Sequence, residues 1–221
     1  RITRLGRRTV KGVAGYDLAG QVVGSEGTLA IVTMARLRVR PLPHPAATAV
    51  AMFADVGAAG RAVASIMTEL TPSMLEVMDN ATIVAVEQAQ PMGLDTSAQV
   101  LLIAQTDSAG TGALGEAQRL TQICEDAGAV ETHCSADPQE ADLLLGARRM
   151  AIPAIEMMGD WLLDDVAVPR STLAEAMLRI QDVAARNDVR ICTFGHAGDG
   201  NLHPMIVTPR GDADAAARAL T

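Results

Sequence analysis

The chain has 221 residues, of which 49% are hydrophobic, so it has enough apolar side chains to bury a core. Its formal net charge of -8 and its 2% of aromatic residues argue against a non-specific nucleic-acid binder, which neutralises phosphates and stacks bases. No run of about 18 uncharged apolar residues occurs, so we expect no transmembrane segment, and the N-terminus lacks the apolar core of a signal peptide.

The first 43 residues contain a glycine-rich turn, then a run at 29–39 that alternates well at its end and predicts a half-exposed strand. The proline-rich segment 41–45 cannot continue a strand ladder, so we expect a domain boundary there, with domains at 1–43 and 44–221. Because the chain does not begin with methionine and ends inside an alanine-rich helical pattern at 212–220, we expect both domains to be truncated.

Beyond the boundary, apolar periodicity predicts strands that alternate with helices. The expected strands are 48–53, 75–78, 100–105, 130–133, 165–168, 189–194 and 205–207, and the expected helices are 57–70, 111–127, 137–150 and 172–185. A loop containing Pro153 is expected after the third helix. The order strand, helix, strand occurs twice at the start. The sequence therefore predicts an α+β domain with a ferredoxin-like antiparallel sheet and helices on one face.

The three cysteines, Cys124, Cys134 and Cys192, are scattered and show no C-x-x-C spacing. This usage indicates a reducing compartment, and we expect a cytoplasmic protein. Each cysteine is interpreted as a small core residue without a catalytic role.

The densest motif is Phe194-Gly-His-Ala-Gly-Asp-Gly-Asn-Leu-His203, which lies between two apolar runs. Asp199-Gly200 predicts a two-residue type I′ hairpin turn, which would place His196 directly opposite His203. Opposed residues have Cβ atoms roughly 4.5–5.5 Å apart, close enough to share a cation. The motif therefore predicts a two-histidine metal or catalytic site whose third ligand is not evident nearby; the alternative is two ordinary histidines beside a turn.

A second motif runs from Gly15 to Thr33 and centres on Gly24-Ser-Glu-Gly-Thr28. Its glycines permit close approach of a ligand, and free N–H groups in such turns suit a pyrophosphate. It lacks the Walker lysine and leads into a predicted strand, so it is neither a Walker loop nor a Rossmann fingerprint. By itself it is equally well explained as a plain glycine turn.

Together the two motifs resemble the FAD-linked oxidase family with a vanillyl-alcohol-oxidase-type flavin domain, in its glycolate oxidase, D-lactate dehydrogenase and D-2-hydroxyglutarate dehydrogenase branch. The resemblance spans nearly the whole chain and implies that residues 1–43 end a flavin domain and 44–221 form a substrate domain. It implies that His196 and His203 hold a divalent metal, zinc or manganese, and that Arg148 binds the substrate carboxylate. The residues that it places around FAD are Gly24, Ser25, Gly27, Thr28 and Ile31.

The resemblance implies FAD-dependent, metal-assisted oxidation of a small 2-hydroxyacid by hydride transfer to the flavin. In the family a phosphate-cradling loop precedes the segment that starts here, and a glutamate-bearing segment follows it and completes the metal site. We therefore expect the chain alone to bind flavin weakly or not at all and to be inactive. An electron-acceptor subunit or a second copy of the chain is an expected partner, and such a subunit would place the protein peripherally at a membrane.

Two alternatives remain. The first is a flavin oxidase from another branch of the superfamily, acting on a phenol or an ether-lipid precursor; the paired histidines favour hydroxyacids over these substrates. The second is a non-catalytic ferredoxin-like module in which the hairpin is only a tight turn.

Overall fold

The computed structural model describes residues 2–39 and 41–220, so the expected truncation points, Arg1 and Thr221, lie outside the described residues. The chain divides into two compact units, Arg1–Leu42 and Pro43–Thr221, and each is described by itself. Within the described residues, no helix combines the length and the apolar character needed to cross a bilayer.

The described part of the first unit contains one short helix, α1 (Leu18–Val22), whose N-cap Asp17 accepts a hydrogen bond from the Gly20 amide. The strand predicted at 29–39 is wrong, because no described segment pairs with it and its side chains are largely exposed. A strand satisfies its backbone N–H and C=O groups only through a neighbouring strand, and alternation alone does not supply one.

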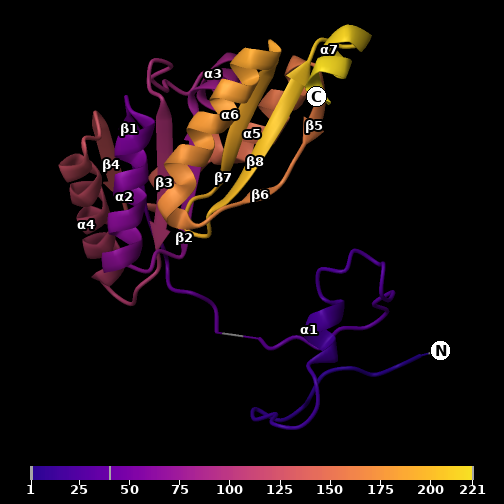
Figure 1. The fold of residues 1–221 in the computed structure, drawn as a ribbon. Helices are drawn as coiled ribbons and strands as arrows, with labels where there is room; N and C mark the ends of the chain where they lie inside the picture. Colours follow the sequence, from indigo (N-terminus) through magenta and orange to yellow (C-terminus); the bar gives the residue numbers. More distant parts are fainter. Residues whose placement is uncertain (1, 40, 221) are drawn as a thin grey trace. The chain divides into compact units, whose positions relative to one another are not determined.

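The second unit begins with the two predicted strand–helix–strand repeats. They comprise β1 (Ala47–Phe53), α2 (Val56–Glu69), β2 (Met74–Asp79), β3 (Val100–Thr106), α4 (Gly112–Ala127) and β4 (Glu131–Ser135). Their strands lie in the order β4-β1-β3-β2 with antiparallel pairing, which is the ferredoxin-like arrangement. The predicted antiparallel α+β fold is therefore confirmed (Figure 1).

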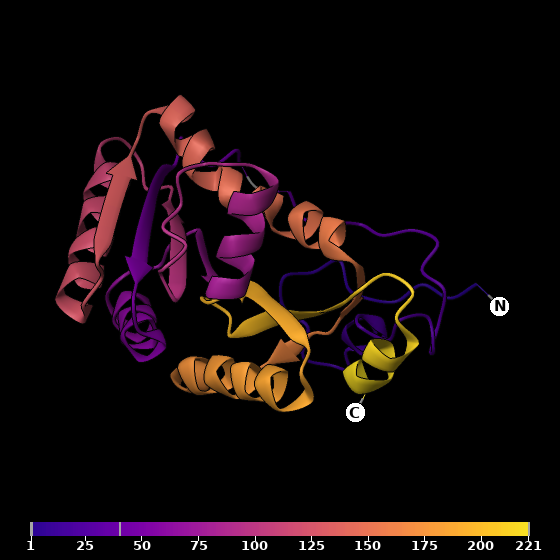
Figure 2. The same ribbon diagram turned by 90° about the horizontal axis from the view of Figure 1, so that it is seen from above.

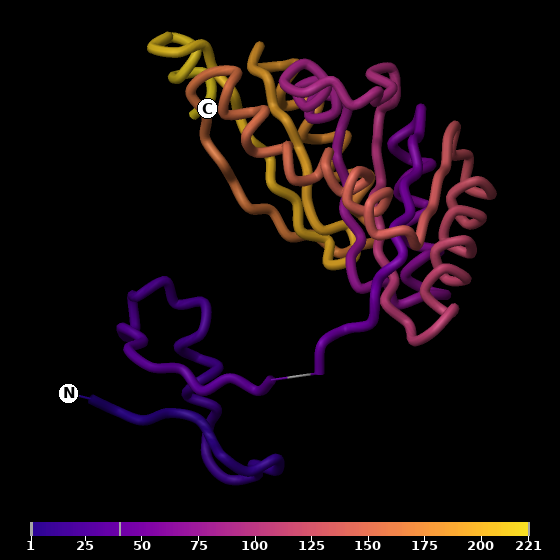
Figure 3. The backbone as a smooth tube through the Cα atoms, turned by 180° about the vertical axis from the view of Figure 1, so that it is seen from behind, coloured from indigo at the N-terminus to yellow at the C-terminus, as the bar shows by residue number. Residues whose placement is uncertain are grey.

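Four more strands extend this sheet beyond β2. They are β5 (Asp160–Leu163), β6 (Val166–Ala167), β7 (Arg190–His196) and β8 (Asn201–Thr208), and the path runs β2-β7-β8-β5 with β6 also paired to β8. All these pairs are antiparallel. The β7–β8 hairpin thus lies beside β2, as Figures 1 and 3 both show.

Helices cover both faces of the sheet, so the expectation of helices on one face is correct only for α2, α4 and α6 (Leu173–Asn187). Helices α3 (Asn80–Ala89) and α5 (Pro138–Met158) pack on the opposite face (Figure 2). The short helix η1 (Arg170–Thr172) precedes α6, and α7 (Ala213–Ala219) follows β8. Helix α3 was not expected, although Asp79 caps it directly after a strand.

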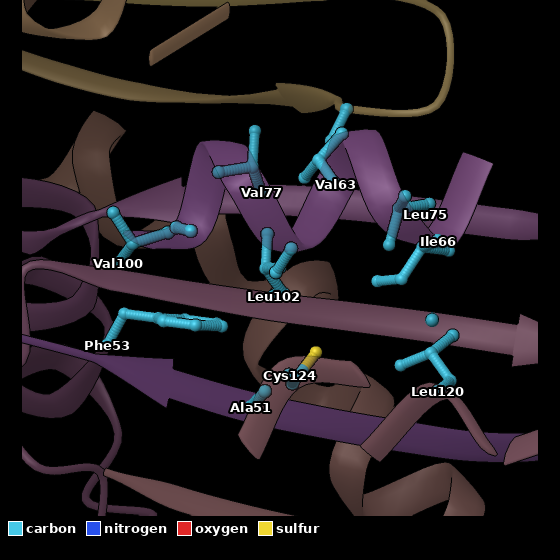
Figure 4. Close-up of a cluster of buried hydrophobic side chains, with 14 of the residues drawn as sticks. Ala51, Phe53, Val63, Ile66, Leu75, Val77, Val100, Leu102, Leu120 and Cys124 are labelled. Atoms are coloured by element: carbon cyan, nitrogen blue, oxygen red, sulfur yellow. The ribbon is translucent and has the colours of Figure 1, made fainter. Parts of the chain in front are cut away.

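Two hydrophobic cores result, because successive residues of a strand face opposite sides. The first core includes Phe53, Ile66, Leu102 and Leu120 beneath α2 and α4 (Figure 4). The second includes Met78, Ile83, Leu101, Ile155 and Phe194 beneath α3 and α5.

Two of the three cysteines lie inside these cores, as expected of small apolar side chains. Cys124 is buried in the first core and Cys192 in the second, and burial raises the pKa of each thiol to about 12. Thiols with so high a pKa are poor nucleophiles.

Helix α5 continues through Pro153, where a loop had been predicted. The proline removes one backbone hydrogen bond, but Ala147, Ala151, Ala154 and Ile155 are buried against the sheet on both sides of it. Packing of this face therefore outweighs the local propensity. Continuity of α5 fixes Arg148 relative to the sheet.

Candidate active site

The hairpin that carries both predicted histidines has a longer loop than the sequence suggested. Residues Ala197–Gly200 form a four-residue connection, so His196 pairs with Asn201, and Phe194 pairs with His203. Only Gly200 in this loop has a positive φ, of 77°, whereas a type I′ turn would require one at Asp199 as well. The predicted pairing of His196 with His203 is therefore wrong by two residues.

The two imidazoles nevertheless lie side by side. A register shift of two residues preserves the face of the sheet, so both side chains point to the same side. Their ring centroids are 5.1 Å apart, with the planes nearly perpendicular at 87°. The side chain of His196 is 40% exposed and that of His203 only 16%, so the pair lies at the edge of the second core.

Arg148 reaches the same place from α5. Its guanidinium carbon lies 4.9 Å from the centroid of the Phe194 ring, a cation–π contact, and the His203 ring lies 5.5 Å from that ring. Arg148 and His203 thus both lie beside the Phe194 ring, with His196 next to His203, although 55 residues separate Arg148 from His203 (203 minus 148).

Each imidazole contacts a carboxylate through its Nδ1 atom, and neither carboxylate was predicted as a site residue. Glu76 in β2 lies 2.5 Å from Nδ1 of His196, and Asp165 lies 2.7 Å from Nδ1 of His203. Glu76 also accepts a hydrogen bond from Nε of Arg148. The available signal for Glu76 was a single acid within the apolar run Met74–Met78, since a buried acid requires partners.

This arrangement leaves three polar groups available to a ligand. Within residues 2–39 and 41–220, no hydrogen bond is made by the Nε2 atom of either imidazole or by the Nη atoms of Arg148. A small cavity of about 170 Å³ also adjoins Glu76, His196 and Asp199. The site can thus offer a cation to an anionic group and two ring nitrogens to a proton or a metal.

The donor set fits one side of a divalent metal site. Metal-binding histidines commonly use one ring nitrogen for the ion and the other for a carboxylate, which is the arrangement of both pairs. The described residues contain no cluster of three or more histidine, cysteine or acidic residues able to hold an ion, so the set is incomplete within them.

The predicted flavin residues form a tight turn in the first unit. Gly24 and Gly27 have φ values of 80° and 81°, and a Cβ atom on either glycine would meet nothing within 4 Å. The Thr28 amide and hydroxyl both donate to the Ser25 carbonyl, and Ile31 is 85% exposed. This open backbone is compatible with close approach of a cofactor.

The chain belongs to the FAD-linked oxidase family, because the family model for "FAD linked oxidases, C-terminal domain" matches residues 42–221. The resemblance inferred from the two sequence motifs is therefore confirmed.

Curated relatives agree with this assignment. The chain is 39% identical over 209 residues to the glycolate oxidase subunit GlcD of Bacillus subtilis, covering 94% of this chain and 44% of the relative. It is 31% identical to GlcD of Escherichia coli K12 over 93% of this chain and 42% of the relative. Identity to the D-lactate dehydrogenase of Archaeoglobus fulgidus is 28%, over 93% and 46% respectively. The chain thus spans less than half the length of these relatives.

Solved structures share the fold at low sequence identity. An alkyldihydroxyacetonephosphate synthase superposes with a TM-score of 0.65 at 17% identity, over 96% of this chain and 46% of the other. A p-cresol methylhydroxylase superposes with a TM-score of 0.57 at 12% identity, over 81% and 42% respectively. At these identities the likeness concerns the fold alone.

Proposed function

We propose that the protein takes part in the FAD-dependent oxidation of a small 2-hydroxyacid of the glycolate, D-lactate or D-2-hydroxyglutarate type. The observation that carries the proposal is that Arg148 and His203 both lie beside Phe194 and that His196 lies next to His203. A cation beside two imidazoles matches the carboxylate and the hydroxyl of a 2-hydroxyacid. The glycolate oxidase and D-lactate dehydrogenase names of the relatives support the same substrate class.

Each site residue has a distinct role in this proposal. Arg148 binds the substrate carboxylate through its Nη groups, which allow a bidentate contact. An imidazole whose Nε2 atom is not ligated to a metal accepts the hydroxyl proton there, while the Cα–H leaves with its electron pair and a 2-oxoacid forms. Phe194 forms an apolar floor beside these groups, which restricts water near the reacting carbon.

The remaining chemistry comes from bound groups. When bound, FAD accepts the hydride and a divalent metal, zinc or manganese, polarises the hydroxyl oxygen. His196 and His203 would hold the metal through Nε2. The residues that would line the flavin are Gly24, Ser25, Gly27, Thr28 and Ile31.

We further propose a cytoplasmic protein that passes its electrons to an acceptor subunit or works as a homo-oligomer. The description of two relatives as subunits of glycolate oxidase supports a partner subunit. Such a subunit would bring the protein to a membrane peripherally.

The substrate class is tested under anaerobic conditions with the full-length FAD-loaded protein, because the 221-residue chain is expected to be inactive alone. Glycolate, D-lactate or D-2-hydroxyglutarate should bleach the flavin absorbance, whereas p-cresol should not. Arg148→Leu should abolish the bleaching at the same substrate concentration, because the carboxylate loses its cation. Bleaching by p-cresol alone would replace this proposal with the phenol-oxidising alternative.

Metal binding separates the enzyme from a non-catalytic module. Titration with Zn²⁺ or Mn²⁺ should show a site that the double variant His196→Ala, His203→Ala loses. The matched control is the double variant His44→Ala, His133→Ala, which removes the other two of the four histidines. Equal metal binding by both double variants would support the module.

We also propose that the 221-residue chain binds flavin weakly by itself and is inactive alone. Its match to less than half of each curated relative supports this. Stoichiometric flavin in the purified chain would refute it.

A further inference from the structure

Glu76 is an unusual residue for its position in the middle of the sheet. It lies in β2 between Met74 and Met78 on the face that carries the second core, and it is only 5% exposed. A carboxylate so far from water is costly unless its oxygens are hydrogen-bonded. Its partners therefore explain why it is tolerated.

Each oxygen of Glu76 is taken by a different site residue. Oε2 accepts a hydrogen bond from Nε of Arg148, and Oε1 lies 2.5 Å from Nδ1 of His196. These contacts join β2 to α5, 72 residues away, and to β7, 120 residues away. The β2–β7 register places Glu76 directly opposite His196, so the second contact is built into the sheet.

The contact decides which nitrogen of His196 carries hydrogen. A carboxylate offers only acceptors, so Nδ1 must be the donor, and the neutral ring then keeps its lone pair on Nε2. In the same way, engagement of Arg148 through Nε leaves both Nη groups for a ligand. Glu76 thus prepares two residues by occupying the atoms that a substrate does not need.

An ion pair that only stabilised the fold would not require the contact between Glu76 and His196. Pinning α5 to the sheet requires only Glu76 and Arg148, whereas the contact to His196 adds nothing to the attachment of α5. The His196 side chain is 40% exposed, so its orientation is not forced by packing alone.

We infer that Glu76 is a positioning residue that fixes the Nδ1–H tautomer of His196 and directs the Nη groups of Arg148 to the same site. The role of Glu76 in substrate oxidation rests on the proposed function, whereas the inference about the His196 tautomer does not.

The test is long-range ¹H–¹⁵N NMR of histidine-labelled protein at about pH 8.5, above the usual imidazole pKa of about 6.5. The signals of His196 are identified by their loss in His196→Gln. In the wild type His196 should be the Nδ1–H tautomer. In Glu76→Gln the charged Arg148 should keep the amide oxygen, so the amide NH₂ faces Nδ1 and the ring hydrogen moves to Nε2.

Asp79→Asn is the matched control, because Asp79 is a second buried acid of β2 and contacts Thr82 instead of a histidine. It should leave the His196 tautomer unchanged. An Nε2–H tautomer in the wild type would overturn the inference without any variant, and so would an unchanged tautomer in folded Glu76→Gln.

A kinetic measurement tests the link to catalysis. In the full-length FAD-loaded protein, Glu76→Gln should lower kcat/KM for the 2-hydroxyacid by about 10- to 100-fold, the usual loss for a residue that orients a metal-ligating side chain. Unchanged kcat/KM would overturn the positioning role. A wild type that oxidises no 2-hydroxyacid would contradict the proposed function alone, since the NMR result would still decide the tautomer.

Discussion

Asp79 makes the stability of the protein depend on pH in an unusual direction. It caps α3 from within the sheet, is 2% exposed, and accepts hydrogen bonds from the amide and hydroxyl of Thr82 at 2.8 and 2.7 Å. Burial raises the pKa of this carboxyl from its ordinary 3.8 to about 6, although the hydrogen bonds from Thr82 lower it in part. The ionised form is therefore disfavoured in the folded state.

The pH dependence of the free energy of unfolding follows from the linkage between protonation of Asp79 and folding. Below about pH 4 the Asp79 carboxyl is protonated in both the folded and the unfolded state, so its burial as an anion costs no stability. Between about pH 4 and 6 the unfolded state releases its proton first, so the free energy of unfolding falls as pH rises. Above about pH 6 the full cost remains, and a rise from 3.8 to about 6 corresponds to about 3 kcal/mol.

Asp79→Asn should remove this cost, because the amide oxygen still accepts from Thr82 but carries no charge. Urea denaturation should show the variant about 3 kcal/mol more stable at pH 7.5, with the difference vanishing near pH 4. Asp55→Asn makes the same exchange at the exposed N-cap of α2 and should lack this gain. A gain in Asp79→Asn that is the same at both pH values would refute the reasoning.

Three glycine substitutions test the packing around the site and the helices. Gly200→Ala should destabilise the protein by about 2 kcal/mol or more, because φ is 77° and the new Cβ would lie 2.1 Å from the Val168 carbonyl oxygen. Gly198→Ala, whose Cβ meets its nearest neighbour at 3.6 Å, should cost less than about 1 kcal/mol, and equal losses in urea denaturation would contradict this difference. Gly60→Ala should cost about 1–3 kcal/mol because its Cβ would lie 2.6 Å from that of Ala174. Ala174→Gly in the same chain should recover most of that loss, and a double-mutant cycle without coupling would exclude the contact.

The sequence predicted the ferredoxin-like half of the domain because its signals are local. Strand 100–105 and helix 111–127 differ from the observed β3 and α4 by one residue at one end each. Predictions failed where a distant partner decides the outcome. The run 29–39 alternates like a strand but finds no neighbour among the described residues, while Pro153 remains helical because α5 packs against the sheet.

The geometry of the candidate site was predicted in part for the same reason. His196 and His203 belong to one short motif, so their proximity could be inferred from local turn chemistry. Glu76 and Asp165 become visible only through strand register, since their partners lie 120 and 38 residues away (203 minus 165). Arg148 required the resemblance to a family, because an arginine on a helix has no local signal of its own.

The error in the hairpin register shows why the histidine site is robust. Strand side chains alternate with a period of two, so a shift of two residues moves His203 along the sheet without changing its face. A shift of one residue would have sent that ring to the first core and left Phe194 without it. The site therefore requires that the strand register shift only by an even number of residues. Insertion of one glycine between Gly198 and Asp199 should separate the two imidazoles and abolish the proposed metal binding, whereas insertion of two should retain part of it. If both insertion variants lost binding to the same extent, the length of the loop, and not an even register shift, would determine whether the two imidazoles lie together.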